Sequence, residues 1–254
     1  MRFCSKFKIQ MKVNFILDVT EKINEFKNIL YSTMCGRFAL NRALGQLRAN
    51  INARRVNTNN RAFTPSNNIA PQSTVPTVMN QEINLLLWGI ENMGNTNPFF
   101  RCEGITKTRP DDIKERRCVV PVDGYFEWCK SHGQNQPYFF SNKNGDLLFL
   151  AAVYTASGRF ALLTRDASNQ VKNVHDRMPV IISLAQIPIW ESNNWRDMLQ
   201  ENPPSLNFFP VSRMALRPGY NGPECVTEIK VKKQSGITDF LQKKNKEKIE
   251  EVLK

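Results

Sequence analysis

From Met34 onward, the chain consists of short apolar runs separated by turn residues. Runs of this length that alternate with polar residues are typical of strands rather than of long helices. The candidate strands cover residues 85–90, 117–122, 125–128, 137–141, 147–154, 160–164 and 179–183. They do not alternate regularly with helices, which disfavours a parallel sheet. We therefore expect an α+β fold with a single sheet-rich domain and flanking helices.

Local signals within this domain predict particular turns and helices. The pair Asp123-Gly124 lies between two candidate strands, and Asp-Gly is a frequent hairpin turn. Residues 41–52 carry Leu44 and Leu47 at a helical spacing, and a second helix is expected inside residues 184–200. The polar stretch 50–60 is predicted to be a loop.

The chain divides into three regions. Residues 34–235 form the expected domain. Residues 1–33 begin with basic residues, but charged residues interrupt their apolar positions, so a secretory signal is not expected. We expect an extension that lacks fixed structure or is absent from the mature protein, and a mitochondrial presequence is an alternative that its acidic residues disfavour. Residues 236–254 are lysine-rich and are predicted to form a basic helical tail.

The charge of the chain favours an anionic partner. Lys and Arg number 35 against 23 Asp and Glu, which ranks nucleic acid ahead of a membrane surface. The excess is densest at the two ends, so the central domain would bind nucleic acid through a few placed arginines rather than a broad cationic face. No apolar run is long enough for a transmembrane helix, so we expect no membrane association.

Cysteine usage indicates a reducing compartment. The six cysteines are far apart, and no Cys-x-x-Cys pair occurs. With only two histidines in the chain, a structural zinc site is not expected. We expect neither a metal nor an organic cofactor.

Four segments combine a reactive side chain with residues that shape the chain: MCGRF at 34–38, NNIAP at 67–71, CVVPVDGYFEW at 118–128 and VHDRMP at 174–179. By residue type alone, Cys35 is a candidate nucleophile, Glu127 is a carboxylate on a strand and His175 is a titratable base. Together they are the parts of a general acid/base site around a thiol. Each also has an ordinary interpretation, as a buried thiol, a solvated acid or a surface ion pair.

These segments also resemble a known family. With LLLWG at 85–89, RCE at 101–103 and PECVTEIKVKK at 223–233, they resemble in sequence and order the SRAP (SOS response-associated peptidase) family, in particular its animal members that process abasic sites. Several ordered motifs are a far more specific signal than one short pattern. The resemblance implies a SRAP domain that binds single-stranded DNA and forms a covalent crosslink with abasic sites. It further implies a monomer with a replication-associated, nuclear location.

The resemblance implies a role for each reactive residue. Removal of Met34 would make Cys35 the N-terminal residue, whose α-amine forms an imine with the sugar aldehyde before its thiol closes a thiazolidine ring. Both groups titrate near neutral pH, so a nearby base would help. Glu127 would be the acid/base group, and His175 would stabilise the intermediate and assist reversal of the crosslink. The family also implies autoproteolysis, which here would remove the residues before Cys35.

The resemblance also implies a set of DNA-binding residues. Arg37, Arg101 and Arg177 match arginines that contact phosphates, and a guanidinium can hold two phosphate oxygens at once. Asn68, in the NNIAP segment, is expected at the DNA as well. Trp88 matches an aromatic residue near the DNA path and would stack on an unpaired base. An ordinary core tryptophan is the alternative for Trp88.

One position departs from the family pattern. The family has an asparagine two residues before the arginine of the RCE segment, where this chain has Phe99. A phenylalanine cannot donate a hydrogen bond to the sugar. Either activity is reduced or another amide acts instead, and Asn97 and Asn68 are the two alternatives.

A further motif lies beyond the expected domain. Gln234, Ile237, Phe240 and Leu241 resemble the motif that binds the sliding clamp (PCNA), in which one helical turn fills an apolar groove. Because the same spacing occurs in any amphipathic helix, packing of this segment on its own domain is the alternative.

Two other functions stay open on the sequence. A non-catalytic reader of modified or single-stranded DNA would fit both Phe99 and a Cys35 whose amine is blocked by an upstream extension. A thiol hydrolase that uses Cys35 and His175 on peptides would leave the arginines unexplained.

Overall fold

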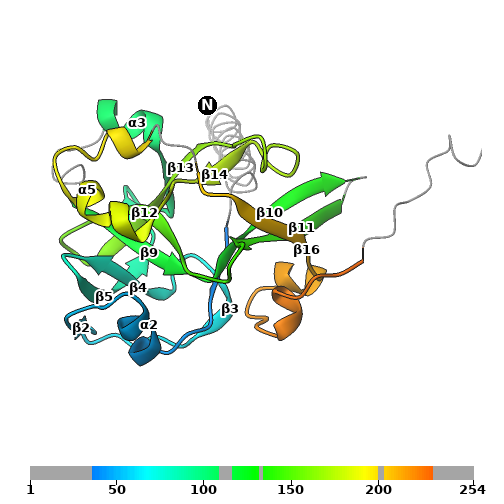
Figure 1. The fold of residues 1–254 in the computed structure, drawn as a ribbon, viewed down its shortest axis with the longest axis horizontal. Coiled ribbons are helices and arrows are strands. Elements are labelled where there is room, and N and C mark those ends of the chain that lie inside the picture. Colours follow the sequence, from blue (N-terminus) through cyan, green and yellow to red (C-terminus); the bar gives the residue numbers. More distant parts are fainter. Residues whose placement is uncertain (1–35, 109–115, 132–133, 200–202, 231–254) are drawn as a thin grey trace, which may run out of the picture.

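The computed structural model describes residues 36–108, 116–131, 134–199 and 203–230. Our expectations for the extension 1–33, for Cys35 and for the tail 236–254 with its clamp-like motif therefore lie outside the described residues. The described part is rich in sheet and has few, short helices, as expected. Figure 1 shows β10, β11 and β16 on one side of the molecule and β4, β5, β9 and β12 on the other.

The strands are β1 (Phe38–Leu40), β2 (Val56–Asn57), β3 (Ser66–Ile69), β4 (Thr74–Met79), β5 (Glu82–Trp88), β6 (Ile90–Asn92), β7 (Asn95–Asn97), β8 (Phe99–Arg101), β9 (Arg117–Val122), β10 (Gly124–Ser131), β11 (Gln134–Asn142), β12 (Leu148–Tyr154), β13 (Arg159–Asp166), β14 (Arg177–Pro179), β15 (Ile181–Ile182) and β16 (Leu206–Pro210). The α-helices are α2 (Leu44–Asn50), α3 (Cys102–Thr108) and α5 (Ile187–Glu191). Short 3-10 turns cover Leu184–Gln186, Asp197–Leu199, Arg213–Leu216 and Pro223–Cys225.

One sheet closes on itself. Strands β13, β12, β9, β4 and β5 pair in this order, and β5 also pairs with β13, so the five strands form a ring. The closing pair, β5 with β13, is parallel, whereas the other pairs of the ring are antiparallel. Strands β2, β8, β14 and β15 add to its edges. We call this ring with its added strands the closed sheet.

The second sheet, which we call the open sheet, has the order β16-β11-β10-β1-β3. Alternate residues of its strands point to opposite faces. On one face, Phe38, Tyr125 and Phe140 join the large hydrophobic core that includes the closed sheet. The other face carries a smaller apolar cluster, the outer cluster, made of Ala39, Phe126, Phe139, Val211, Ala215 and Cys225. The alternation on β10 therefore decides which residues face the closed sheet.

The predicted hairpin turn at Asp123-Gly124 is wrong. Strand β9 belongs to the closed sheet and β10 to the open sheet, so this pair is a corner where the chain crosses between sheets. Asp123 fixes the corner through a 2.6 Å ion pair with Arg42 Nε and through its N–H, which donates to Ala39 O at 2.8 Å. Gly124 is required for space, because a Cβ atom there would lie 2.4 Å from Phe140 O and from the Phe139 ring.

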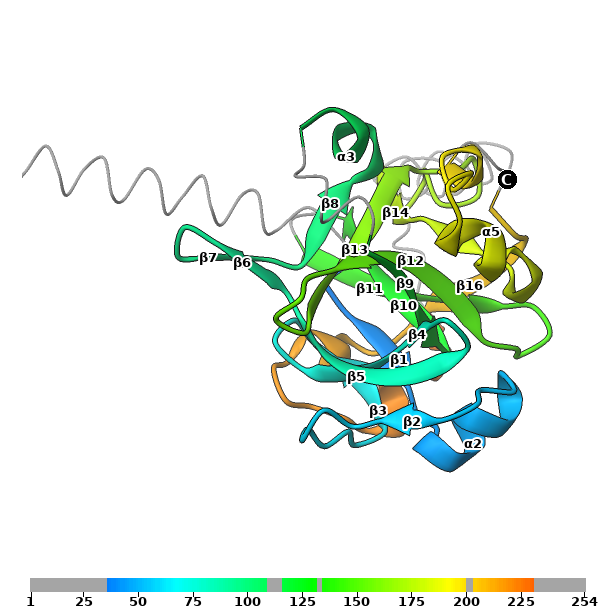
Figure 2. The ribbon, with the colours of Figure 1, turned by 90° about the vertical axis from the view of Figure 1, so that its left-hand side faces the viewer.

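The candidate strand at 85–90 is divided into two elements. Strand β5 ends at Trp88, and Gly89 turns the chain at a φ of 119° into the β6–β7 hairpin. This hairpin projects from the body of the protein (Figure 2). The remaining candidate strands are confirmed, and 117–122 coincides with β9, while the predicted strand at 179–183 is split between β14 and β15.

The predicted helices are present but shorter. Helix α2 covers the middle of the predicted range 41–52 and buries Leu47, with Leu44 partly buried beside it. In the range 184–200, α5 has five residues and is flanked by 3-10 turns. The predicted loop 50–60 contains only the two-residue strand β2. Within the described residues, no helix has the length and apolar character needed to cross a membrane.

We predict that Gly124→Ala destabilises the fold by about 1–3 kcal/mol, because the added methyl group overlaps a backbone oxygen and a buried ring. The free energy of unfolding, measured with urea, checks this. The matched control is Gly45→Ala in α2, where a Cβ atom meets nothing within 4 Å and the change should stabilise by up to about 1 kcal/mol. Equal stability of the two variants would contradict the role of Gly124 as a spacer.

Candidate functional site

Glu127 lies between the two sheets. It is on β10 with the same alternation as Tyr125, so it faces the closed sheet, and it is fully buried. Its direct partner on β11 is Tyr138. On the other side, the N–H of Phe126 donates to Arg37 O at 3.0 Å. Continuing this pairing by one residue puts Gly36, the first described residue, opposite Glu127.

His175 comes from the closed sheet, in the loop that joins β13 to β14. The loop is anchored by Val171, which is fully buried and whose carbonyl accepts a 3.0 Å hydrogen bond from the N–H of His175. The imidazole is mostly buried, and its Nδ1 lies 3.7 Å from Glu127 Oε2. The structure thus brings together two of the three predicted catalytic residues, while Cys35 lies outside the described residues.

The peptide groups of Arg177 hold the imidazole. The N–H of Arg177 is 3.0 Å from His175 Nδ1, and the carbonyl oxygen of the same residue is 3.1 Å from it. When Nδ1 of the neutral ring accepts from that N–H, the ring proton is on Nε2. In the protonated ring, Nδ1–H donates to the carbonyl. In each state, one of the two peptide groups pairs with Nδ1 and the other does not.

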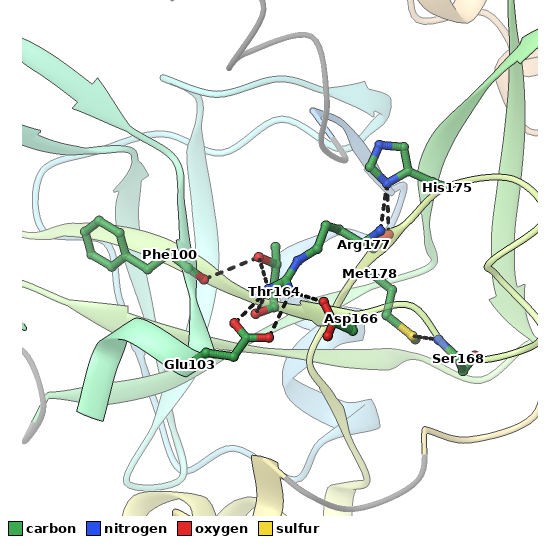
Figure 3. A network of polar contacts seen from close by, with 8 residues as sticks. All are labelled: Phe100, Glu103, Thr164, Asp166, Ser168, His175, Arg177 and Met178. Carbon is green, nitrogen blue, oxygen red and sulfur yellow. Dashed lines mark hydrogen bonds and ion pairs between the residues drawn. The ribbon is translucent and has the colours of Figure 1, made fainter. Parts of the chain in front are cut away.

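Arg177 is engaged by the protein's own acceptors, with which any phosphate would compete, and its phosphate contact stays a prediction. It is buried, and its guanidinium lies among Glu103, Asp166 and Thr164 (Figure 3). Nη1 donates to Glu103 Oε1 at 2.8 Å and to Asp166 Oδ1 at 2.5 Å. Nη2 donates to Glu103 Oε2 at 3.0 Å and to Thr164 O at 2.8 Å. A phosphate could reach these nitrogens only by displacing the protein's own acceptors.

The surroundings of Arg177 and Glu103 favour the charged form of both side chains. Burial lowers the pKa of Arg177, but its hydrogen bonds to Glu103 and Asp166 outweigh burial, so the net shift is upward. The hydrogen bond from Arg177 is the main cause of the lowered pKa of Glu103. The stability that this ion pair gives to the folded state is therefore fully present when the pH is above the ordinary pKa of a glutamate. It is lost as the pH falls through the lowered pKa of Glu103.

Arg37 and Asn68 lie together, but on the other face of the open sheet. Arg37 Nη1 donates to Asn68 Oδ1 at 3.1 Å and to the carbonyls of Ala215 and Arg217. Asn68 Nδ2 donates to Ala215 O at 3.1 Å and to Tyr220 O at 2.7 Å. Both side chains thus fasten the 3-10 segments of the C-terminal part to β1 and β3. Asn68 is buried with its amide fully engaged, so neither its DNA role nor its role as the replacement amide fits this structure.

Trp88 is a core residue, so the expected stacking on a base does not fit the structure. It is fully buried, and its Nε1–H donates to Pro98 O at 3.0 Å. Its ring packs on Phe38 at 4.7 Å and on Phe160 at 6.2 Å between centroids. Phe99, the residue at the family's asparagine position, contacts it edge-on at 5.6 Å. The position of the missing amide is therefore occupied by an aromatic core contact.

The roles of two polar residues, Arg101 and Asn97, stay predictions. Arg101 is exposed at the end of β8, opposite Thr164 of β13, and is therefore close to the Glu103–Arg177 pair. Its phosphate contact stays a prediction. Asn97 ends β7, is partly exposed and lies opposite Ile90 in the hairpin. It is the remaining candidate for the replacement amide.

Two aromatic residues beside the site, Tyr138 and Phe208, were not predicted from the sequence. Tyr138, the cross-strand partner of Glu127, is partly exposed. Phe208 on β16 is 41% exposed, stacks on Phe140 at 5.2 Å and lies 6.4 Å from Tyr138 between centroids. Both are on the face that carries Glu127. Only the pairing of β10, β11 and β16 reveals this, because each strand alone shows just an apolar run.

Three of the four cysteines in the described ranges, Cys102, Cys118 and Cys225, are poor nucleophiles. Burial, with a smaller contribution from Glu103, raises the pKa of Cys102 to about 11. Burial also raises the pKa of Cys118 and of Cys225. Within the described ranges, no cluster of His, Cys, Asp or Glu has the arrangement of a metal site. Two cavities of about 510 and 500 Å³ flank Leu184, and no site residue lines either of them.

The fold and the site together define a class of protein. It is a two-sheet domain that buries a carboxylate, Glu127, next to an imidazole, His175, and the segment that leads into β1 reaches this pair at Gly36. The model of the SRAP (SOS response associated peptidase) family matches residues 34–217, and the chain belongs to this family.

Curated relatives and a solved structure agree with this assignment. The abasic site processing protein YoqW of Bacillus subtilis (strain 168) is 25% identical over 223 residues, which cover 76% of this chain and 99% of YoqW. The abasic site processing protein HMCES of Mus musculus is 25% identical over 243 residues, which cover 68% of each chain. A crystal structure of a Bacteroides thetaiotaomicron protein matches with a TM-score of 0.66 at 16% identity, covering 77% of this chain and 100% of the other, and it supports the fold alone.

We predict that Trp88→Phe lowers the free energy of unfolding by about 1–3 kcal/mol, because it removes one of the two hydrogen bonds to the buried Pro98 carbonyl, which keeps only the N–H of Leu162, and because the smaller ring packs less well in the core. The same variant should bind single-stranded DNA with unchanged affinity, since the ring is inaccessible to a base. Urea unfolding and fluorescence anisotropy measure the two quantities. Unchanged stability with weakened DNA binding would restore the stacking role.

Proposed function

We propose that this protein processes abasic sites in single-stranded DNA by forming a covalent crosslink through Cys35. The observation that carries the proposal is the buried Glu127 next to His175, at the point where the pairing of β1 with β10 brings Gly36 opposite Glu127. Cys35 directly precedes Gly36 in the sequence. The printed names of YoqW and HMCES support abasic-site processing.

The proposed chemistry needs proton transfers at each step. The α-amine of Cys35 adds to the aldehyde carbon of the opened sugar, and loss of water from the adduct gives an imine. The thiolate then adds to the imine carbon, and the nitrogen takes up a proton to complete a thiazolidine ring. In total, one water molecule is released and nothing is oxidised or reduced.

Glu127 and His175 fit these transfers. A carboxylate can accept a proton from the amine and return one to the leaving hydroxyl group, provided that it lies within reach of both. His175 has a hydrogen-bond partner for Nδ1 in either charge state, because Arg177 offers an N–H to the neutral ring and a carbonyl to the protonated ring. Its Nε2 would then exchange the proton with the sugar or with the thiazolidine when the crosslink reverses.

DNA binding would use the surface around this pair. Tyr138 and Phe208 offer exposed ring area on the face of Glu127, and bases stack on such rings with little regard to sequence. Arg101 supplies a positive charge near the same edge. The overall excess of basic residues adds a salt-dependent attraction to the backbone of DNA.

Further parts of the proposal concern residues outside the described ranges. Autoproteolysis would release residues 1–33 together with Met34 and expose the amine of Cys35. A nuclear role at replication, with binding of a sliding clamp through Gln234, Ile237, Phe240 and Leu241, would bring the protein to single-stranded DNA.

The crosslink is tested with two versions of the chain, one that begins at Met1 and one that begins at Met34, each incubated with single-stranded DNA that contains one abasic site. We expect the Met34 version to give a heat-resistant band on a denaturing gel, and we expect Cys35→Ala to abolish it, because only a free N-terminal cysteine can form the ring. If the Met1 version also crosslinks, N-terminal sequencing should find a new end at Cys35. Crosslinking by the Cys35→Ala variant would contradict the chemistry.

A non-catalytic reader of modified or single-stranded DNA is the second candidate function. Phe99 favours it, because this residue packs on Trp88 where the family has an amide. Reversible, salt-sensitive binding by both versions without any crosslink would select the reader. In that case, Cys35→Ala would leave the affinity unchanged.

We predict that Phe208→Ala weakens binding to single-stranded DNA by about 1–2 kcal/mol, through the loss of one stacking surface. Anisotropy titrations at fixed salt measure the change. The matched control is Ile189→Ala, an exposed apolar residue on α5 that is 42% accessible. Equal affinities of the two variants would rule out Phe208 as a stacking residue.

A further inference from the structure

Arg177 connects His175 to helix α3, and the connection depends on Glu103. The two carboxylate oxygens of Glu103 accept from the two terminal nitrogens of Arg177, at 2.8 and 3.0 Å (Figure 3). This two-point arrangement fixes the plane of the guanidinium as well as its position. Asp166 makes one bond to the same guanidinium from a side chain that is 89% exposed. Glu103 is therefore the acidic residue that defines the geometry.

Both ends of Arg177 are thereby held. Its backbone pairs with Asp166 in the ladder between β13 and β14, and its side chain is fastened to α3 and to Thr164. Its N–H and carbonyl lie 3.0 and 3.1 Å from His175 Nδ1. The pairing of β14 with β13 and the buried side chain of Met178 also hold the strand. The guanidinium is thus one of the restraints on the peptide groups that orient the imidazole, and it is the one that Glu103 controls.

We propose that Glu103 is a positioning residue for His175 and acts on it through Arg177. For the reaction, this inference rests on the proposed function. The bonds of Glu103 to the guanidinium of Arg177, and the contacts of the Arg177 peptide groups with His175, form the path from Glu103 to the imidazole. The alternative is that Glu103 restrains an arginine whose task is to bind phosphate. The two roles predict opposite effects of removing the carboxylate.

The test compares Glu103→Gln with the wild-type chain, both starting at Cys35. Glu91→Gln is the matched control, because Glu91 also pairs with an arginine, Arg159, at 2.5 Å, away from the site. The tautomer of His175 is read from the nitrogen chemical shifts of its imidazole. The chain has only two histidines, so a His132→Gln background assigns the signals. Crosslinking rates are measured on abasic DNA, and reversible affinities are measured in a Cys35→Ala background.

In the wild-type chain and in Glu91→Gln, we expect the neutral ring of His175 to carry its proton on Nε2. In Glu103→Gln, we expect a mixture of the two tautomers and a crosslinking rate that is about tenfold lower, since small displacements of a catalytic group are costly. The DNA affinity should stay within about twofold of the wild-type value. Glu103→Asp, which retains a carboxylate, should restore part of the tautomer preference, and it serves as the second variant if Glu103→Gln fails to fold.

Unchanged imidazole signals in Glu103→Gln would overturn the proposal, whether or not the chain reacts with DNA. A rise in DNA affinity with unchanged crosslinking would identify Arg177 as a restrained phosphate ligand and would also overturn it. If the wild-type chain forms no crosslink, the proposed function fails, while the imidazole signals still decide the role of Glu103.

Discussion

The crossing of the chain from one sheet to the other at Asp123 is the constraint on which the rest of the structure depends. It joins β9 of the closed sheet directly to β10 of the open sheet, and Asp123 ties the corner to Arg42 and Ala39. Because the corner is tight, the start of β10 has only one alternation in which Tyr125 enters the core and Phe126 faces the outer cluster. Glu127 therefore points toward the closed sheet, as Tyr125 does, since side chains on a strand alternate between its two faces.

A buried carboxylate is costly unless its surroundings compensate it. The fold provides the surroundings from separate parts of the sequence: β10 supplies Glu127, and the loop before β14 supplies His175. The loop is in turn held by Val171 in the core and by the bonds of Arg177 to Glu103. Acid/base groups that are fixed by packing and hydrogen bonds need little rearrangement before they act. The energetic cost of the site is thus offset by elements that have no direct part in the chemistry.

The sequence predicted most of the strands, because apolar runs such as 117–122 and 147–154 report burial directly. It also paired Glu127 with His175 correctly, through the motifs that carry the family resemblance. It failed where the outcome depends on which strands become neighbours. Asp123-Gly124 has the composition of a hairpin turn and serves as a corner, and Trp88 carries a ring that could stack on a base but is buried in the core. Tyr138 and Phe208 were invisible for the same reason, because their position beside Glu127 is a property of register.

The two peptide groups that face His175 Nδ1 have a consequence for the kinetics of the site. A change of charge at this ring exchanges one peptide partner for the other, because in each state only the N–H or the carbonyl can pair with Nδ1. By microscopic reversibility, making and undoing a bond through this imidazole then pass through the same arrangement of protein atoms. Because both partners belong to Arg177, the proton transfers that make or undo such a bond would be accompanied by a local exchange of hydrogen bonds within residues 175–177.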